Sequence, residues 1–145
     1  MKNKGIKTKI ENGVTYVYDI IRRKYLVLTP EEKVRQTFLH YLVTELSFSP
    51  GLIRTELGTR YHELNKRTDI LVFDSSGQPF MLVECKAAEV KISVQVIEQA
   101  SRYNLSFRAP YVCVTNGRST YCFHIDFDRG TTRQLREIPT PAKNQ

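Results

Sequence analysis

The stretch Thr68–Lys86, TDILVFDSSGQPFMLVECK, constrains the fold of this chain more than any other. Two apolar runs, Ile70–Phe73 and Phe80–Cys85, flank a turn-rich segment at residues 74–79. This pattern predicts a β-hairpin with a loop of several residues. The second run is apolar on both of its alternating faces, which is typical of a central strand that is buried on both sides. We therefore expect the fold to be built around this hairpin.

Three charged residues lie at the ends of the two predicted strands. Asp69 begins the first strand, and Glu84 and Lys86 close the second. Residues two apart on a strand point to the same face, so Glu84 and Lys86 share a face. Antiparallel pairing brings Asp69 close to both. Burying charged groups here costs free energy unless something interacts with them, so this cluster is a candidate functional site.

The pattern D…ExK formed by Asp69, Glu84 and Lys86 resembles the active-site signature of the PD-(D/E)xK nuclease superfamily, with threonine at residue 68 where the superfamily name has proline. The wider chain, from about Arg22 to Phe127, resembles the N-terminal nuclease domain of type I restriction enzyme R subunits. The segments that carry this resemblance are TPEEKVRQ, KRTDILVF, LVECKAAEV, EQASRYN and VTNG. The alternative interpretation of the three charged residues is an ordinary Glu–Lys cross-strand network at a solvent-facing strand end.

The resemblance implies metal-dependent cleavage of DNA. Asp69 and Glu84 would hold Mg²⁺ or Mn²⁺, with the backbone carbonyl of Cys85 as a third ligand. Mg²⁺ prefers oxygen ligands and keeps several waters, so one or two carboxylates suffice to bind it. Lys86 would either orient or deprotonate the attacking water, or stabilise the developing charge as a cation. The residues alone do not distinguish these two roles.

Further candidate residues lie on two predicted helices. Gln99 and Tyr103 match the QxxxY element found in some of these nucleases, which implies catalytic roles; the alternative is a helix–sheet hydrogen bond. Glu32 is placed for a capping box with Thr29, and it is also a candidate metal ligand, because many superfamily members use a carboxylate from this helix. Glu56, in a strand before the hairpin, is a weaker candidate of the same kind.

The predicted fold class is α/β (α+β): a restriction-endonuclease-like core with a mixed central sheet, two main flanking helices and an N-terminal β-hairpin. The helices are expected at Pro30 to about Leu46 and at about Ser93 to Phe107. We expect one nuclease-like domain at residues 1–127, made of an N-terminal β extension (1–28) and a core (29–127), followed by a polar tail (128–145). Further strands are expected at Ile6–Ile10, Val14–Asp19, Tyr25–Leu28, Leu52–Leu57, Tyr111–Thr115 and Thr120–Ile125.

Composition narrows the class of protein. The 145 residues carry a formal net charge of +7, which is compatible with binding nucleic acid through phosphate contacts. No apolar run approaches the roughly 18 residues that span a bilayer, and no secretory signal is visible, so we expect a cytoplasmic protein that does not enter membranes. The cysteines are interpreted as buried free thiols and the histidines as incidental. These residues are Cys85, Cys113 and Cys122, and His40, His62 and His124.

The leading functional prediction is a Mg²⁺-dependent DNA endonuclease of the restriction type. The sequence contains no GxxxxGK[ST] motif, so these residues carry no motor for translocation. The domain would act alone, as a homodimer, or with separately encoded motor or specificity subunits. The alternatives are a catalytically inactive nuclease-fold module that binds DNA, and a structural subunit of a restriction or defence complex.

Overall fold

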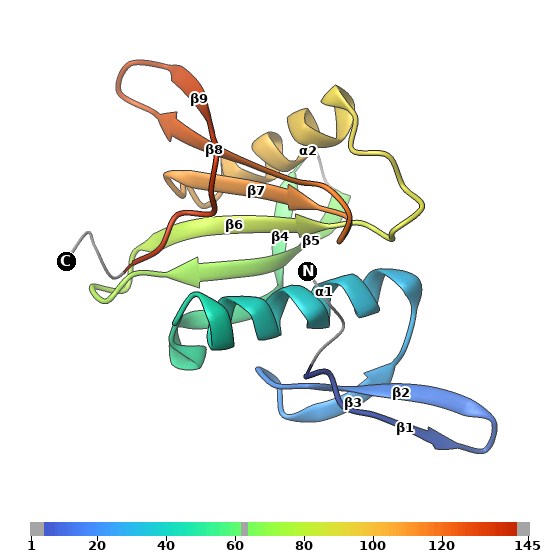
Figure 1. Ribbon diagram of the computed structural model, residues 1–145. Coiled ribbons are helices and arrows are strands. Elements are labelled where there is room, and N and C mark those ends of the chain that lie inside the picture. Colours follow the sequence, from blue (N-terminus) through green and yellow to red (C-terminus); the bar gives the residue numbers. More distant parts are fainter. Residues whose placement is uncertain (1–4, 62–63, 142–145) are drawn as a thin grey trace.

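The computed structural model describes residues 5–61 and 64–141, and it contains two β-sheets and two α-helices in this part of the chain (Figure 1). The smaller sheet has the strand order β1-β2-β3, and the larger has the order β4-β5-β6-β7-β8-β9. In the larger sheet β6 and β7 are parallel, and the other neighbours are antiparallel. The predicted mixed sheet with two helices is therefore confirmed, and the predicted N-terminal hairpin is extended by a third strand.

The strands are β1 (Thr8–Glu11), β2 (Val14–Asp19), β3 (Lys24–Val27), β4 (Ile53–Tyr61), β5 (Leu64–Phe73), β6 (Pro79–Cys85), β7 (Tyr111–Thr115), β8 (Thr120–Asp126) and β9 (Thr131–Leu135).

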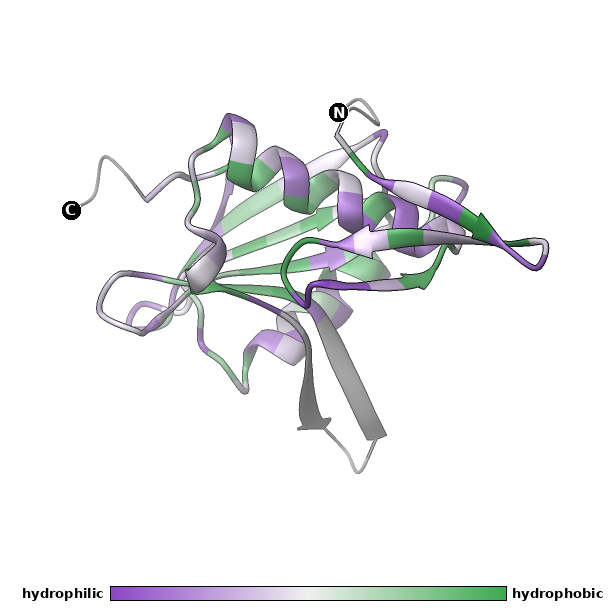
Figure 2. Ribbon diagram, turned by 90° about the horizontal axis from the view of Figure 1, so that it is seen from below, coloured by the Kyte–Doolittle hydropathy of each residue, from purple (hydrophilic) through white to green (hydrophobic). Residues whose placement is uncertain are grey.

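Helix α1 (Pro30–His40) covers one face of the larger sheet. Its start follows from the sequence, because the Thr29 hydroxyl accepts the Glu32 backbone N–H at 3.0 Å and Pro30 occupies the first turn. A π-helical turn, Tyr41–Glu45, continues it. Where α1 crosses the sheet the strands are mainly apolar (Figure 2). The helix buries Val34, Phe38 and Leu39 in the same core cluster as Ile70, Val72, Met81 and Val83 of β5 and β6.

Helix α2 (Val94–Asn104) covers the opposite face. Ser93 caps its start by accepting the Val96 backbone N–H at 3.3 Å. Ala100 and Tyr103 pack in a second apolar cluster, with Leu71, Leu82, Val112 and Val114 from β5, β6 and β7. Strands β6 and β7, and residues 70–72 of β5, are thus buried on both faces, as the apolar character of β6 predicted.

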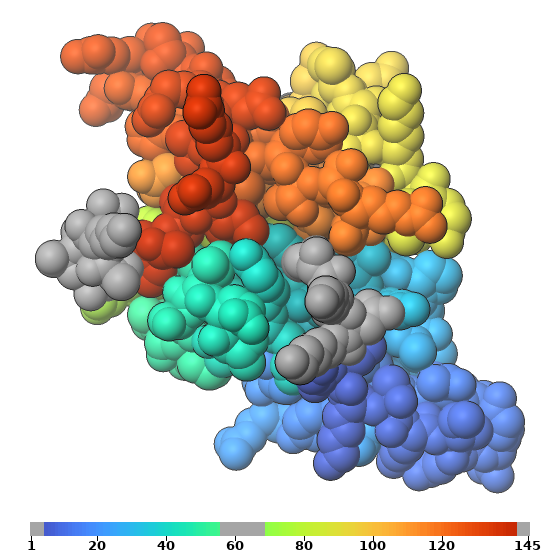
Figure 3. All heavy atoms as spheres, in the orientation of Figure 1, coloured from blue at the N-terminus to red at the C-terminus, as the bar shows by residue number. Residues whose placement is uncertain are grey.

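The smaller sheet lies against α1 on the side away from the larger sheet, and in the space-filling view it projects from the rest of the molecule (Figures 1 and 3). Val17 and Asp19 of β2 are fully buried. The Asp19 carboxylate accepts backbone N–H groups of Ile21 and Arg22 at 2.8 and 2.9 Å. This small sheet therefore covers the outer side of α1.

The C-terminal region differs from the predicted polar tail at residues 128–145. Thr131–Leu135 form β9, which pairs antiparallel with β8 from Asp126–Thr131 to Cys122–Leu135. Four of the five β9 residues are exposed, so this edge strand carries no apolar alternation by which the sequence could reveal it.

Two further sequence-based expectations concern membrane-spanning helices and the cysteines. No helix in residues 5–61 and 64–141 is long and apolar enough to cross a membrane. The three cysteines are free and buried, as expected. The Cys113 thiol lies 3.4 Å from the Met81 sulfur in the core.

Candidate active site

The predicted site lies at one edge of the larger sheet, where the pairing of β5 with β6 ends. The last pair of the β5–β6 ladder is Ile70 with Val83. Beyond this pair, the Cys85 backbone N–H donates to a side chain instead of to a backbone carbonyl. Its acceptor is Asp69 Oδ2, at 2.7 Å. This bond fixes Asp69 against the end of β6, so the structure brings Asp69 close to Glu84, as the hairpin predicted.

Glu84 is an acid in an environment that disfavours its charge. It is 6% exposed, and its strand neighbour on the other side is Val114 of β7. Its Oε1 is buried with no hydrogen-bond partner among the described residues, and its Oε2 lies 3.7 Å from Lys86 Nζ. Burial and the negative charge of Asp69 raise the pKa of Glu84 to about 9, against the opposing effect of Lys86. Glu84 is therefore mainly neutral at pH 7 in this structure.

Arg35 of α1 is a site residue that the sequence interpretation missed. Its buried guanidinium contacts the carboxylates of Asp69 and Glu32, and it lies 3.3 Å from Glu31 Oε1. Burial lowers the pKa of Arg35, but the charges of Asp69 and Glu32 outweigh burial and raise it, so Arg35 stays a cation. The sequence signal that could have identified Arg35 is its position on α1. It lies three residues before Phe38, which is buried, and therefore on the same side of the helix.

Glu32 departs from the predicted capping box. Thr29 accepts the Glu32 backbone N–H, but the Glu32 carboxylate is buried and accepts from Arg35 and from Gln36 Nε2, the latter at 2.9 Å. Arg35 lies between Glu32 and Asp69, so the structure connects Glu32 to the strand ends through a guanidinium. Its role as a metal ligand stays a prediction.

Tyr103 and Gln99 lie on α2, which packs on the face of the sheet that carries Leu82. Tyr103 is 5% exposed, and burial and the negative charge of Glu84 raise its pKa. The Tyr103 hydroxyl is therefore within electrostatic reach of the acidic pair. Gln99 is half-buried one turn earlier, and in the described part of the chain it makes no hydrogen bond with that pair. The catalytic roles of both residues stay predictions.

Hydrogen bonds join Lys86 and the loop after it to the end of β7 and the β7–β8 turn. The Lys86 backbone N–H donates to the Thr115 carbonyl at 2.8 Å. Asn116, which is 6% exposed, donates from Nδ2 to the Val90 carbonyl at 2.8 Å. Its Oδ1 also accepts the Arg118 backbone N–H at 2.9 Å. The Asn116-Gly117 pair is typical of a turn, but no sequence pattern signals the bond from Asn116 to the loop after β6.

The donor set at this edge is small among the side chains that the structure describes. The side chains of Glu56 and His62 lie outside the described part of the structure. Among the residues that are described, no group of three or more His, Cys, Asp and Glu side chains has a geometry suited to a metal. What the edge offers is a pair of carboxylates, Asp69 and Glu84, with the ammonium group of Lys86 beside Glu84.

Comparison with known protein families assigns the chain to a family of restriction enzyme domains. Residues 30–139 match the family model described as the type I restriction enzyme R protein N terminus (HSDR_N). The match covers most of the chain, and the chain belongs to this family.

Two solved structures resemble the protein. A fragment assigned as an HsdR subunit of a type I restriction enzyme from Vibrio vulnificus YJ016 superposes with a TM-score of 0.57 at 19% identity, over 79% of this chain and 24% of that one. The type IIG restriction endonuclease BpuSI gives a TM-score of 0.42 at 17% identity, over 69% and 11%. The first likeness shows the fold alone, and the chain spans about a quarter of that structure. No curated protein sequence matches the chain.

Proposed function

We propose that this chain is a Mg²⁺-dependent DNA endonuclease domain of the restriction type. The observation that carries the proposal is the buried, unpartnered oxygen of Glu84 next to the carboxylate of Asp69 and the ammonium group of Lys86. A native protein rarely leaves a buried carboxylate oxygen without a partner unless a ligand supplies one. Membership of the restriction R-protein family supports DNA as the substrate.

The donor set suits a hard divalent cation. Asp69, Glu84 and the Cys85 carbonyl would hold Mg²⁺ or Mn²⁺, since all three offer oxygen and Mg²⁺ keeps several of its waters. Glu84 Oε1 is available, whereas Asp69 Oδ1 contacts Arg35 and Asp69 Oδ2 accepts the Cys85 N–H. When bound, such a cation supplies an activated water and neutralises charge at phosphorus.

The protein's own groups have distinct proposed roles. Glu84 gives up its proton when it becomes a ligand. Lys86 lies beside it and either orients or deprotonates the attacking water, or stabilises the charge that develops on the phosphate. Tyr103 would donate a hydrogen bond to an anionic Glu84, and Gln99 would contact the scissile phosphate or a bound water. Arg35 holds Asp69 and is a positioning residue.

The proposed setting is the cytoplasm. The formal charge of +7 favours a polyanionic substrate. The type I context of the family supports work alongside separately encoded motor or specificity subunits, and a homodimer would allow both strands to be cut.

The test is nicking of supercoiled plasmid with Mg²⁺, and with EDTA as the metal-free control. We expect Glu84→Gln and Lys86→Ala each to lower the rate by about 10²-fold or more, as for loss of a group that stabilises a transition state. The matched controls are Glu98→Gln and Lys91→Ala, exposed residues on α2 and in the loop before it. Circular dichroism checks folding. Equal rates for wild type and the two site variants would sink the proposal, because the nuclease would then be a contaminant.

One observation favours the second candidate, a nuclease-fold module that binds DNA without cutting it. The Arg35 guanidinium occupies Asp69 Oδ1, an atom that a metal ligand needs to share. Titration calorimetry with Mg²⁺ separates the candidates. The endonuclease requires a Mg²⁺ site that Glu84→Gln removes, whereas the binding module has salt-sensitive DNA affinity and no such site.

A further inference from the structure

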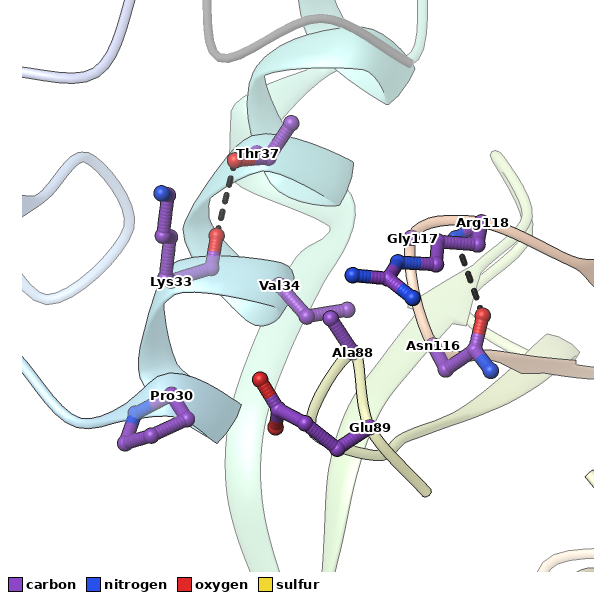
Figure 4. Close-up of a pocket in the computed structure, with 9 residues that line it drawn as sticks. All are labelled: Pro30, Lys33, Val34, Thr37, Ala88, Glu89, Asn116, Gly117 and Arg118. Atoms are coloured by element: carbon purple, nitrogen blue, oxygen red, sulfur yellow. Dashed lines mark hydrogen bonds between the residues drawn. The ribbon is translucent and has the colours of Figure 1, made fainter. Parts of the chain in front are cut away.

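A cavity of about 310 Å³ opens beside the candidate active site (Figure 4). It lies between the first half of α1, the loop after β6 and the β7–β8 turn. Val34 and Ala88 supply apolar walls, and Lys33, Glu89 and Arg118 supply charged ones. None of the residues that line it belongs to the acidic pair or to Lys86.

The described residues provide no ion-pair partners for the charged walls of this cavity. Within the described part of the chain, Lys33, Glu89 and Arg118 form no salt bridge. The Arg118 guanidinium extends towards Val34, and the Glu89 carboxylate points towards the first turn of α1 (Figure 4). Two cations against one carboxylate leave the cavity with a positive balance. The positive charges of Lys33 and Arg118 are therefore available to an anionic ligand.

The walls are fixed before any ligand arrives. Asn116 joins the loop after β6 to the turn through its bond to Val90, and it anchors the backbone of Arg118. Gly117 has φ +86°, a backbone conformation that favours glycine, and this turn lies in ordinary contact distance of a Val34 methyl group, 3.6 Å from a Cβ built on Gly117. A preorganised site loses little entropy when it binds.

The cavity lies close to the acidic pair. Ala88 follows Lys86 by two residues, so their Cα atoms are at most about 7 Å apart. Strands β6 and β7 are parallel, and both therefore end at this edge of the sheet (Figure 1). A strand of DNA with one phosphate at Lys86 would reach the cavity with a neighbouring nucleotide.

We propose that this cavity binds a sugar–phosphate unit of the DNA strand, next to the phosphate that is cut. The phosphate contacts Arg118 and Lys33, and the deoxyribose packs on Val34 and Ala88. A guanidinium presents a planar fork that matches phosphate oxygens, and a lysine adds a mobile point charge. Glu89 weakens the site and tunes its affinity. The identity of the polymer rests on the proposed function.

The experiment measures DNA affinity by fluorescence anisotropy, with a labelled duplex in EDTA so that no cleavage occurs. We expect the Lys33→Ala/Arg118→Ala double variant to bind about 10-fold or more weakly and to lower the slope of log affinity against log salt by about 1. The matched control is Arg133→Ala/Arg136→Ala, which removes two exposed cations on and beyond β9 and leaves affinity and slope nearer to wild type. Glu89→Gln should bind several-fold more tightly, because it removes a repulsive charge.

The outcomes separate this inference from the endonuclease proposal. Equal losses in the cavity and control variants would overturn the cavity site, even if wild type cuts plasmid. Weaker binding by Glu89→Gln would also overturn it, because the cavity would then favour a cationic group. Selective loss in the cavity variant supports the inference even if wild type does not cut. Circular dichroism checks that each variant is folded.

Discussion

The guanidinium of Arg35 and the carboxylate of Asp69 form a buried ion pair that joins α1 to β5. Replacing Arg35 by Met keeps much of the volume of the side chain but leaves Asp69 and Glu32 as buried carboxylates without their cation. Breaking a buried pair in this way costs about 3–5 kcal/mol. We expect Arg35→Met to lower the free energy of unfolding by that order, measured by urea titration at pH 7.

A second ion pair of Arg35, the one with Glu31, provides the control for this prediction. Glu31 also contacts Arg35, but its side chain is 48% exposed, and an exposed pair contributes about 0–1 kcal/mol. Glu31→Gln should therefore change the free energy of unfolding little. If Arg35→Met is as mild as Glu31→Gln, the pair between Arg35 and Asp69 does not persist in solution.

The raised pKa of Glu84 predicts how stability depends on pH. The folded protein holds the Glu84 proton up to a pKa of about 9, whereas the unfolded chain releases it near the ordinary value of 4.5. The folded state therefore binds more protons between these values. The contribution is full below pH 4.5 and is lost as pH rises towards 9, by at most about 1.4 kcal/mol per pH unit.

Urea titrations at pH 5, 7 and 9 measure this slope. Glu84→Gln carries no titrating group at this position, so its stability should fall less across the range than that of wild type. Glu98→Gln, on the exposed side of α2, should keep the wild-type slope. Identical slopes for wild type and Glu84→Gln would mean that Glu84 is ionised in the folded protein.

Metal binding by the proposed site should release a proton. At pH 7 Glu84 is mainly neutral, and a ligand to Mg²⁺ must be a carboxylate, so about one proton leaves for each cation bound. Calorimetry in buffers of different ionisation enthalpy measures this number. We expect affinity to rise by up to about tenfold per pH unit below pH 9. Mg²⁺ binding without proton release would place the cation elsewhere.

The buried turn residue Asn116 should matter more than a similar exposed one. Asn116→Ala removes the bond to Val90 and two bonds to turn N–H groups. We expect a loss of about 1–3 kcal/mol in the free energy of unfolding. Asp126 makes two comparable bonds in an exposed turn, to Asp128 and Arg129. Asp126→Ala should cost less, and a cost equal to that of Asn116→Ala would contradict the role of the Val90 bond.

The sequence predicts most of the sheet because the decisive signals are local. Apolar runs and turn residues locate β2 and β7 with the bounds that the structure shows, and Thr29-Pro30 locates the start of α1. Alternation along β6 predicts Phe80 on the Leu82 face. Phe80 instead joins the cluster on the other face, because the register shifts between Val72 and Phe73 and leaves it opposite no partner. A bulge of this kind has no signature in the apolar pattern.

The candidate site is only partly predictable for the same reason. The proximity of Asp69 and Glu84 follows from hairpin pairing alone. The contacts of Arg35 with Asp69 and of Asn116 with Val90 join residues 34 and 26 positions apart, and periodicity carries no information on such pairs. The edge strand β9 was missed because its exposed residues resemble a solvated tail.

The parallel pairing of β6 with β7 also affects when the site acquires its chemistry. The β5–β6 hairpin joins residues that are near in sequence, whereas the neighbour of Glu84 on its other side, Val114, belongs to β7. Val114 reaches it only after the chain has passed through α2 and returned, and parallel pairing over such a separation is slow to form. The raised pKa of Glu84 therefore depends on a contact that only the complete sheet supplies.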